Sequence, residues 1–139
     1  MKSRKIKGGY LLVFGQGEKL IGSLIEFCQA QKVQAGWLSG LGAIEAAEIG
    51  YYNLAKKAYH FVKLDSLLEI VSLVGNVAMF KAKPYLHIHT VLSDEGMKTY
   101  GGHLKEAAVG GTCEIHLTVF DSRLERQADV ETGLNLLDV

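Results

Sequence analysis

The sequence predicts an α+β domain built on a largely antiparallel sheet. One stretch, residues 18–32, has apolar side chains at helical spacing. About seven other stretches are short and apolar or alternate between apolar and polar residues, as strands do. The connections between these stretches are short, which favours antiparallel pairing because parallel strands need long crossovers.

The chain has the size and composition of one domain. Its 139 residues suit a single core, and 48% of them are hydrophobic. The one proline is Pro84, and no linker, repeat or low-complexity segment divides the chain. We therefore expect a single domain over residues 1–139, with its core over about residues 8–137.

The first elements follow from the change in period. Residues 9–14 form a short apolar run between glycines, which is typical of a buried strand. The predicted helix over residues 18–32 has Glu18 in its first turn, where the helix dipole favours an acid. A helix between two strands is expected to pack on the face of the sheet.

Three strand-like stretches come next. Residues 33–43 predict a strand that leads into a bend allowed by Gly40 and Gly42. Residues 44–52 and 58–64 predict two further strands.

The segment over residues 67–80 has two interpretations. Gly75 and Asn76 lie inside it, so it is either two strands joined by a tight turn or one strand with a bulge. Residues 85–92 alternate and predict a strand that begins after Pro84, with its core face formed by Leu86, Ile88 and Leu92.

The last third of the chain predicts a loop, a strand and an apolar end. Gly101 and Gly102 are expected in a loop, and residues 112–120 in a strand. An apolar tail often docks on the body of its protein or on a neighbouring subunit, and here it contains Leu134, Leu136, Leu137 and Val139.

Charge and sequence pattern narrow the classes of function. Fifteen basic and fifteen acidic residues give a net charge of zero, whereas dedicated nucleic-acid binders usually have a basic excess. A basic cluster near the start, Lys2 to Lys7, is interpreted as a solvated terminus.

No apolar run suits a bilayer or a signal peptide, so we expect a cytoplasmic protein. Cys28 and Cys113 are expected to be free, buried thiols.

Three histidines form a candidate metal site. His87 and His89 are two residues apart on a predicted strand, so they share a face with Cα atoms about 6–7 Å apart. His103 follows the two glycines and could supply a third ligand from the loop. Three neutral imidazoles with an open fourth position suit zinc or a similar divalent metal. The alternative is two polar-face histidines and an unrelated loop histidine.

Other polar residues are weaker candidates. Glu114, His116 and Thr118 alternate with apolar residues and could orient the histidines, although an ordinary solvent or interface face is the preferred interpretation. Glu69 and Asn76 could line the same cleft.

Six short motifs occur in an order that is specific to one family. They are Gly17–Glu18, Ser39–Ala43, Gly50–Tyr52, Glu69–Asn76, His87–His89 and Gly101–His103. Over about residues 10–137 the chain thus resembles the plant-and-prokaryote conserved (PPC) domain, in the stand-alone form found in prokaryotes.

The resemblance implies an antiparallel sheet flanked by helices and a homotrimer. It also implies a fold-level likeness to acetolactate decarboxylase, which holds zinc with three histidines. Plant members are fused to AT-hook motifs that bind DNA, but this chain contains no Arg-Gly-Arg-Pro segment.

The combined expectation is a trimeric binding module with a divalent metal, zinc, held by His87, His89 and His103. Its cleft would take a small-molecule ligand or a protein partner, and DNA binding would be weak or absent. One alternative is a metal-dependent lyase or hydrolase, in which the metal polarises a carbonyl or activates water. The other is a DNA-associated regulatory protein like the plant relatives.

Overall fold

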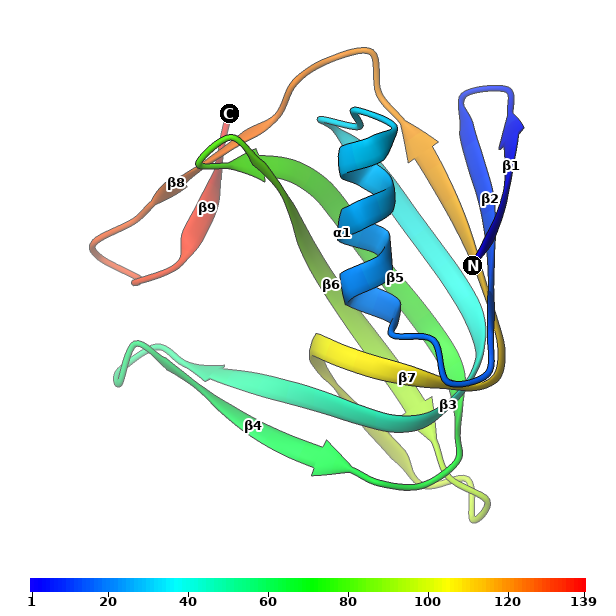
Figure 1. Ribbon diagram of the computed structural model, residues 1–139. Coiled ribbons are helices and arrows are strands. Elements are labelled where there is room, and N and C mark those ends of the chain that lie inside the picture. Colours follow the sequence, from blue (N-terminus) through cyan, green and yellow to red (C-terminus); the bar gives the residue numbers. More distant parts are fainter.

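The protein is almost entirely β-structure (Figure 1). The computed structural model describes residues 1–139. Nine strands hold about 65% of these residues, and the one helix has 11 residues. In chain order the elements are β1 (Lys2–Ile6), β2 (Gly9–Gly15), α1 (Leu20–Ala30), β3 (Gly36–Asn53), β4 (Ala58–Leu64), β5 (Leu68–Phe80), β6 (Lys83–Ser93), β7 (Thr99–Val119), β8 (Glu125–Ala128) and β9 (Asn135–Asp138).

The predicted α+β class, with helices flanking the sheet, is therefore wrong. Only one stretch of the sequence has a helical period, and the tail that could have supplied another helix forms the β8–β9 hairpin instead. Asp129 explains the turn of this hairpin, because its Oδ2 accepts hydrogen bonds from both the backbone N–H and the hydroxyl of Thr132. Gly133 completes the turn with a φ of 76°.

The strands form one connected sheet. Its order is β1-β2-β7-β3-β5-β8-β9, with β4 paired to β3 and with β6 paired to both β5 and β7. Every pairing is antiparallel except a single parallel bridge between Met79 of β5 and Glu125 of β8. The expected antiparallel pairing is confirmed in this sense.

The long strands β3 and β7 each serve two parts of the sheet. The first half of β3 pairs with β5 and its second half with β4, while β7 pairs with β6 at its start and with β2 at its end. The register shifts around Gly42, whose φ is 137° and whose missing Cβ would collide with the carbonyl oxygen of Thr112. The predicted glycine bend is confirmed, although it lies inside one strand instead of between two.

Two other turn predictions are resolved by the pairing. Residues 68–80 form one strand, and its register shift falls between Ile70 and Ser72, so Gly75 and Asn76 lie in regular sheet. Gly101 and Gly102 also lie in a strand, because they pair with Val91 and Thr90 of β6. The predicted loop there is wrong.

Helix α1 packs on one face of the sheet and closes the core (Figure 1). Leu20, Leu24, Phe27 and Cys28 are its buried residues. They meet buried side chains that alternate along the strands, among them Leu12 and Ile115. Both cysteines are free and buried, as the sequence predicts.

The acid at the start of α1 is not the expected one. Glu18 precedes the helix, and its carboxylate accepts a hydrogen bond from the N–H of Gly15. Glu106 of β7 instead accepts hydrogen bonds from the first-turn N–H groups of Ile21 (2.8 Å) and Gly22 (3.1 Å). A carboxylate distant in sequence therefore satisfies donors that no local residue caps.

With 11 residues, α1 is too short to cross a membrane, and it is the only helix. The single-domain boundaries and the cytoplasmic location stay predictions.

Candidate metal centre

Strand β6 places His87 and His89 on one face because side chains alternate along a strand. On the opposite face Ile88 and Leu92 are buried in the core, as predicted, and Leu86 packs against it partly buried. Thr90 is also buried there, and its hydroxyl donates to the carbonyl of Ser72 at 2.9 Å.

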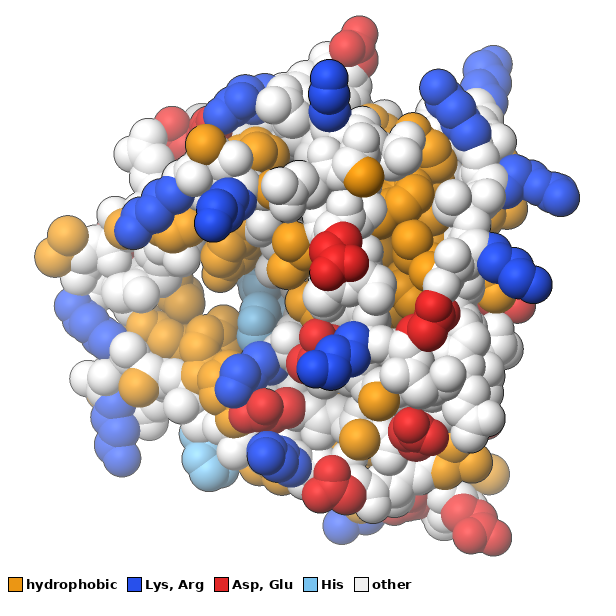
Figure 2. All heavy atoms as spheres, in the orientation of Figure 1, with side chains coloured by type: hydrophobic (Ala, Val, Ile, Leu, Met, Phe, Trp, Pro, Cys, Tyr) orange, Lys and Arg blue, Asp and Glu red, His pale blue; other side chains and the backbone are white.

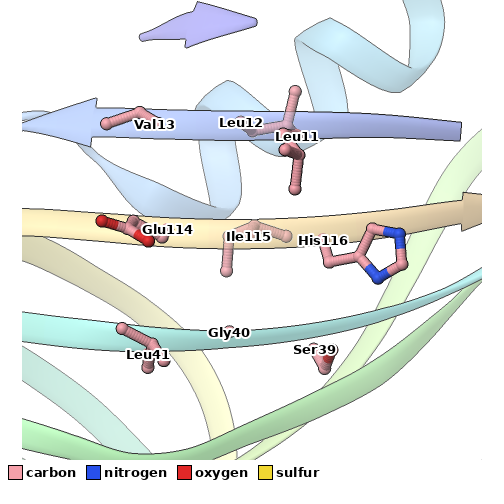
Figure 3. A pocket seen from close by; sticks show the side chains of 9 residues that line it. All are labelled: Leu11, Leu12, Val13, Ser39, Gly40, Leu41, Glu114, Ile115 and His116. Carbon is pink, nitrogen blue, oxygen red and sulfur yellow. The ribbon is translucent and has the colours of Figure 1, made fainter. Parts of the chain in front are cut away.

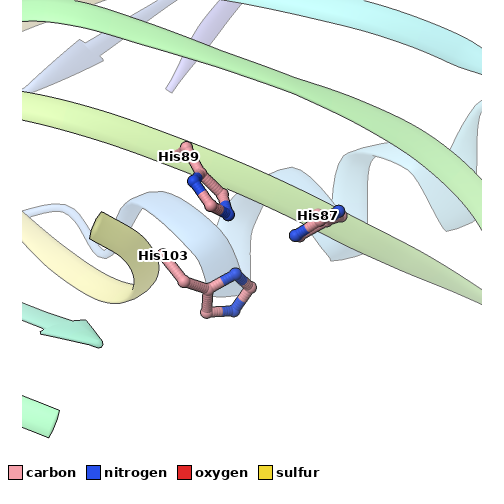
Figure 4. A group of neighbouring side chains, drawn as sticks. All are labelled: His87, His89 and His103. Atoms are coloured by element: carbon pink, nitrogen blue, oxygen red, sulfur yellow. The ribbon is translucent and has the colours of Figure 1, made fainter. Parts of the chain in front are cut away.

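The third histidine comes from the neighbouring strand and not from a loop. His103 of β7 lies directly opposite His89 of β6 in the antiparallel register. The sheet therefore brings together all three predicted ligands (Figure 4). One ligand atom from each of them lies within 4.8 Å of the others, and the ring centroids of His87 and His89 are 5.0 Å apart.

The imidazole of His103 has a buried nitrogen without a partner. Its Nδ1 makes no hydrogen bond, and Figure 4 shows one ring nitrogen of His103 turned toward His87 and His89. Leaving a buried polar atom unpaired is costly, so such an atom in the middle of a histidine cluster fits a bound cation.

Burial keeps two of the rings neutral. Burial, followed by the charges of His87, His89 and Arg126, lowers the pKa of His103 to about 4. Burial, followed by the charges of Arg126 and His89, also lowers the pKa of His87. Neutral imidazoles offer the lone pair that a metal needs.

Aromatic rings from the β3–β4 hairpin form one wall of the site. The ring centroid of Tyr59 is 4.9 Å from that of His103, and Tyr59 stacks on Phe61 at 5.1 Å. Gly50 lies beside His103 in the register, and a Cβ there would stand 2.6 Å from the Phe61 ring. The glycine of the Gly-Tyr-Tyr motif is therefore what allows the rings to lie against His103.

Arg126 of β8 forms the opposite wall, and the sequence did not reveal it. Its guanidinium donates from Nη1 to the carbonyl of Asn135 and from Nη2 to Oδ1 of Asn76, both at 2.7 Å. It also lies over the Tyr85 ring, 5.0 Å from the centroid. Asn76 pairs with His87 across β5 and β6, which places the guanidinium beside the histidines.

The histidines line a recess between two hairpins. Figure 2 shows a hollow that contains histidine side chains, between the β8–β9 hairpin and the β3–β4 hairpin of Figure 1. At the rim the two hairpins touch: the Tyr52 hydroxyl donates to the carbonyl of Thr132, and Lys57 Nζ to that of Val130, both at 2.7 Å. We call this hollow the histidine recess.

The other candidates divide between this recess and distant parts of the sheet. Asn76 lies in the recess wall, as predicted. Glu69 is exposed and pairs with Ser93, away from the histidines. His116 pairs with Ser39 on β3, whereas His103 pairs with Gly50 on the same strand.

Glu114 and His116 instead line a shallow groove on the sheet face that α1 leaves uncovered (Figure 3). Its other exposed apolar side chains are Leu11, Val13 and Leu41. Glu114, His116 and Thr118 therefore do not orient the histidines, and the alternative of a solvent or interface face is the correct one.

Comparison with known proteins places this geometry in a family. A metal-containing protein from Archaeoglobus fulgidus is 38% identical, with a TM-score of 0.85 over 97% of this chain and 94% of that one. A candidate DNA-binding protein from Bacteroides thetaiotaomicron is 26% identical, with a TM-score of 0.95 over 99% of this chain and 96% of that one.

A longer relative contains a similar segment. The bifunctional protein GlmU of Synechococcus sp. (strain JA-3-3Ab) is 32% identical over 120 residues, which are 84% of this chain. The chain spans only 18% of that relative's length.

The likeness to acetolactate decarboxylase is confirmed at the level of the fold. The enzyme from Bacillus subtilis has a TM-score of 0.56 and 12% identity, over 91% of this chain and 58% of that one. The family model of the Plants and Prokaryotes Conserved (PCC) domain matches residues 1–121. The chain belongs to this family, as its six motifs predict.

Proposed function

We propose that this protein is a metal-binding module that holds one zinc ion with His87, His89 and His103. The observation that carries the proposal is the convergence of three ligand atoms within 4.8 Å of one another, in a cluster where Nδ1 of His103 is buried and has no hydrogen-bond partner. The ion would keep a fourth position open toward the histidine recess, where a ligand can reach it. The metal-containing relative from A. fulgidus supports a metal here.

The donor set favours zinc. Imidazole is a borderline ligand that suits zinc, and zinc–nitrogen distances are about 2.0–2.1 Å. Tetrahedral geometry then places the nitrogens roughly 3.3 Å apart, so the rings must draw together slightly from their present spacing. His89 is exposed and can make that rotation without disturbing the core.

Binding fits the recess better than catalysis. The side chains around the histidines are those of Arg126, Asn76 and tyrosines. None of their contacts is with a carboxylate that could act as a general base. Burial raises the pKa of Tyr59, which keeps its phenol protonated at neutral pH, so it is not available as a general base. Turnover of a carbonyl substrate that is lost on chelation would favour the lyase or hydrolase alternative.

We also propose a homotrimer. The sheet face opposite α1 carries exposed apolar side chains and has no covering element, so a neighbouring subunit is a natural partner for it. Sedimentation equilibrium is expected to give three times the mass of one chain. A stable monomer at micromolar concentration would contradict the proposal.

DNA binding is proposed to be weak and non-specific. A protein of zero net charge releases few counterions on binding a duplex. A gel-shift assay at physiological salt is expected to show no selective complex, and tight, sequence-selective binding would favour the DNA-associated alternative.

The metal site is tested by metal content after exhaustive dialysis against buffer with trace zinc. Wild type is expected to retain about one equivalent per chain, and His89→Ala far less. His116→Ala is the matched control because it removes a histidine from the distant groove, and it should retain as much zinc as wild type. Equal retention by wild type and His89→Ala would show that the three histidines are not a metal site.

A further inference from the structure

The histidine recess contains a buried guanidinium without an acidic partner. The Arg126 residue is only 8% exposed, and its Nε has no hydrogen-bond acceptor. A guanidinium has five N–H donors, of which this one uses two. The three ion pairs of the protein join Met1 to Glu18, Lys105 to Glu48 and Arg123 to Glu125, so none includes Arg126. A buried cation without a counter-charge is unfavourable unless something else supplies the charge.

The position of this guanidinium is fixed. Asn135, Asn76 and the Tyr85 ring hold it from three directions. These contacts satisfy part of its donor set and leave the rest free, as in sites where a rigid arginine fork recognises a planar anion.

The charges of the recess also indicate that an anion is missing. Three neutral imidazoles would leave the full double charge on a bound zinc ion, and Arg126 adds a further positive charge. The groups whose charge acts on His87 and His103 are Arg126 and the other histidines, with no carboxylate among them. An anion that reaches both cations is therefore the missing component.

The anion fits an organic carboxylate better than a phosphate. Arg126 is the one guanidinium of the recess, and a single planar fork matches the geometry of one planar carboxylate. Of the nearby lysines, Lys105 lies over the Phe61 ring and pairs with Glu48, and Lys57 donates to the carbonyl of Val130. The N-terminus of α1, a possible phosphate site, is already occupied by Glu106. The walls are tyrosine rings, which suit the carbon part of a ligand.

We propose that the histidine recess binds a small organic carboxylate, whose carboxylate group pairs with Arg126 and occupies the open position of the metal. The inference rests on the proposed function, since the recess is that of the proposed zinc site. It assigns a role to a residue that lies beyond the segment matched by the family, residues 1–121.

The test uses sodium benzoate as the probe, with inorganic phosphate for comparison. The chain has only three arginines, Arg4, Arg123 and Arg126, so their Nε–H resonances can be resolved by ¹⁵N NMR. Benzoate is expected to shift the Arg126 resonance alone, both in chelator-treated and in zinc-loaded protein. Calorimetry should show benzoate binding at least tenfold tighter once zinc is present, and phosphate binding more weakly than benzoate.

Variants separate the site from the fold. Arg126→Gln is expected to weaken benzoate binding at least tenfold, and Arg126→Lys to give an intermediate loss because it keeps the charge but not the fork. Arg123→Gln is the matched control: it removes an exposed arginine of the same tail and should bind benzoate like wild type. Because Arg126 also anchors the tail, circular dichroism of each variant accompanies the titrations, and the wild-type resonance shift tests the site without any substitution.

The outcomes distinguish this inference from the proposed function. If zinc is retained but Arg126→Gln binds benzoate as wild type does, the carboxylate site is overturned and the metal site stands. If wild type retains no zinc after dialysis against trace zinc but benzoate still shifts the Arg126 resonance, the metal site fails and the pairing of the carboxylate with Arg126 stands. Tighter binding of phosphate than of benzoate would overturn the choice of a carboxylate.

Discussion

The two faces of strand β6 serve different purposes within a few residues. Ile88 and Leu92 face α1 and are almost completely buried, whereas His87 and His89 face the recess and keep access to it. Because alternate side chains point to opposite faces, neither set constrains the identity of the other. The difference teaches that stability and the candidate site can be changed separately on one strand.

Substitution on the core face is expected to have the largest effect. Ile88→Ala should lower the free energy of unfolding by about 2–5 kcal/mol because it leaves a cavity. His89→Ala, one residue away, should change it by less than about 0.5 kcal/mol, since an exposed side chain has little packing to lose. Urea denaturation of metal-free protein measures both, and equal losses would remove the distinction between the faces.

Gly50→Ala is expected to affect both the stability of the protein and its zinc retention. The new methyl group would overlap the Phe61 ring, so we expect a loss of about 1–3 kcal/mol in stability. It should also lower zinc retention, because the displaced rings pack on His103. Gly111→Ala is the control, since a Cβ there meets nothing within 4 Å. Normal zinc retention by Gly50→Ala would show that the aromatic wall does not position His103.

The same comparison can be made along β7. Glu106→Gln removes the negative charge that lies at the N-terminus of α1. It should lower the free energy of unfolding by about 1 kcal/mol. Glu114→Gln, exposed on the uncovered face, should have almost no effect. Thermal unfolding of the two variants checks this, and a similar shift in Tm would mean that the cap contributes nothing.

The smallest expected effect is a pH dependence of the metal-free protein. Because the pKa of His103 is lowered to about 4 in the folded state, the unfolded chain binds more protons between about pH 6.5 and pH 4. The stability that His103 provides is complete above about pH 6.5 and is lost as the pH falls toward 4. His103→Asn should take up about one proton fewer on unfolding in this window, as urea titrations at several pH values would show.

The sequence predicted the elements whose determinants are local. The alternation of residues 85–92 predicted both the buried face and the shared face of His87 and His89. The helix was recognised from its period, although it begins after Glu18.

Long-range pairing could not be predicted in the same way. His103 was expected in a loop because two glycines precede it, but the register of β6 against β7 draws that stretch into the sheet. Arg126 gave no local signal at all, since its position depends on contacts with Asn76, which lies 50 residues earlier. The fold class was wrong for a related reason: the tail pairs with itself and with distant strands instead of forming a helix.

The recess is assembled from two separable stretches of chain. The histidines lie within residues 1–121, which the family model matches, and Arg126 lies in the eighteen residues that follow this segment. The guanidinium and the three histidines are therefore set by different stretches of the sequence, so a substitution in the tail can alter one wall of the recess without replacing any of the three histidines.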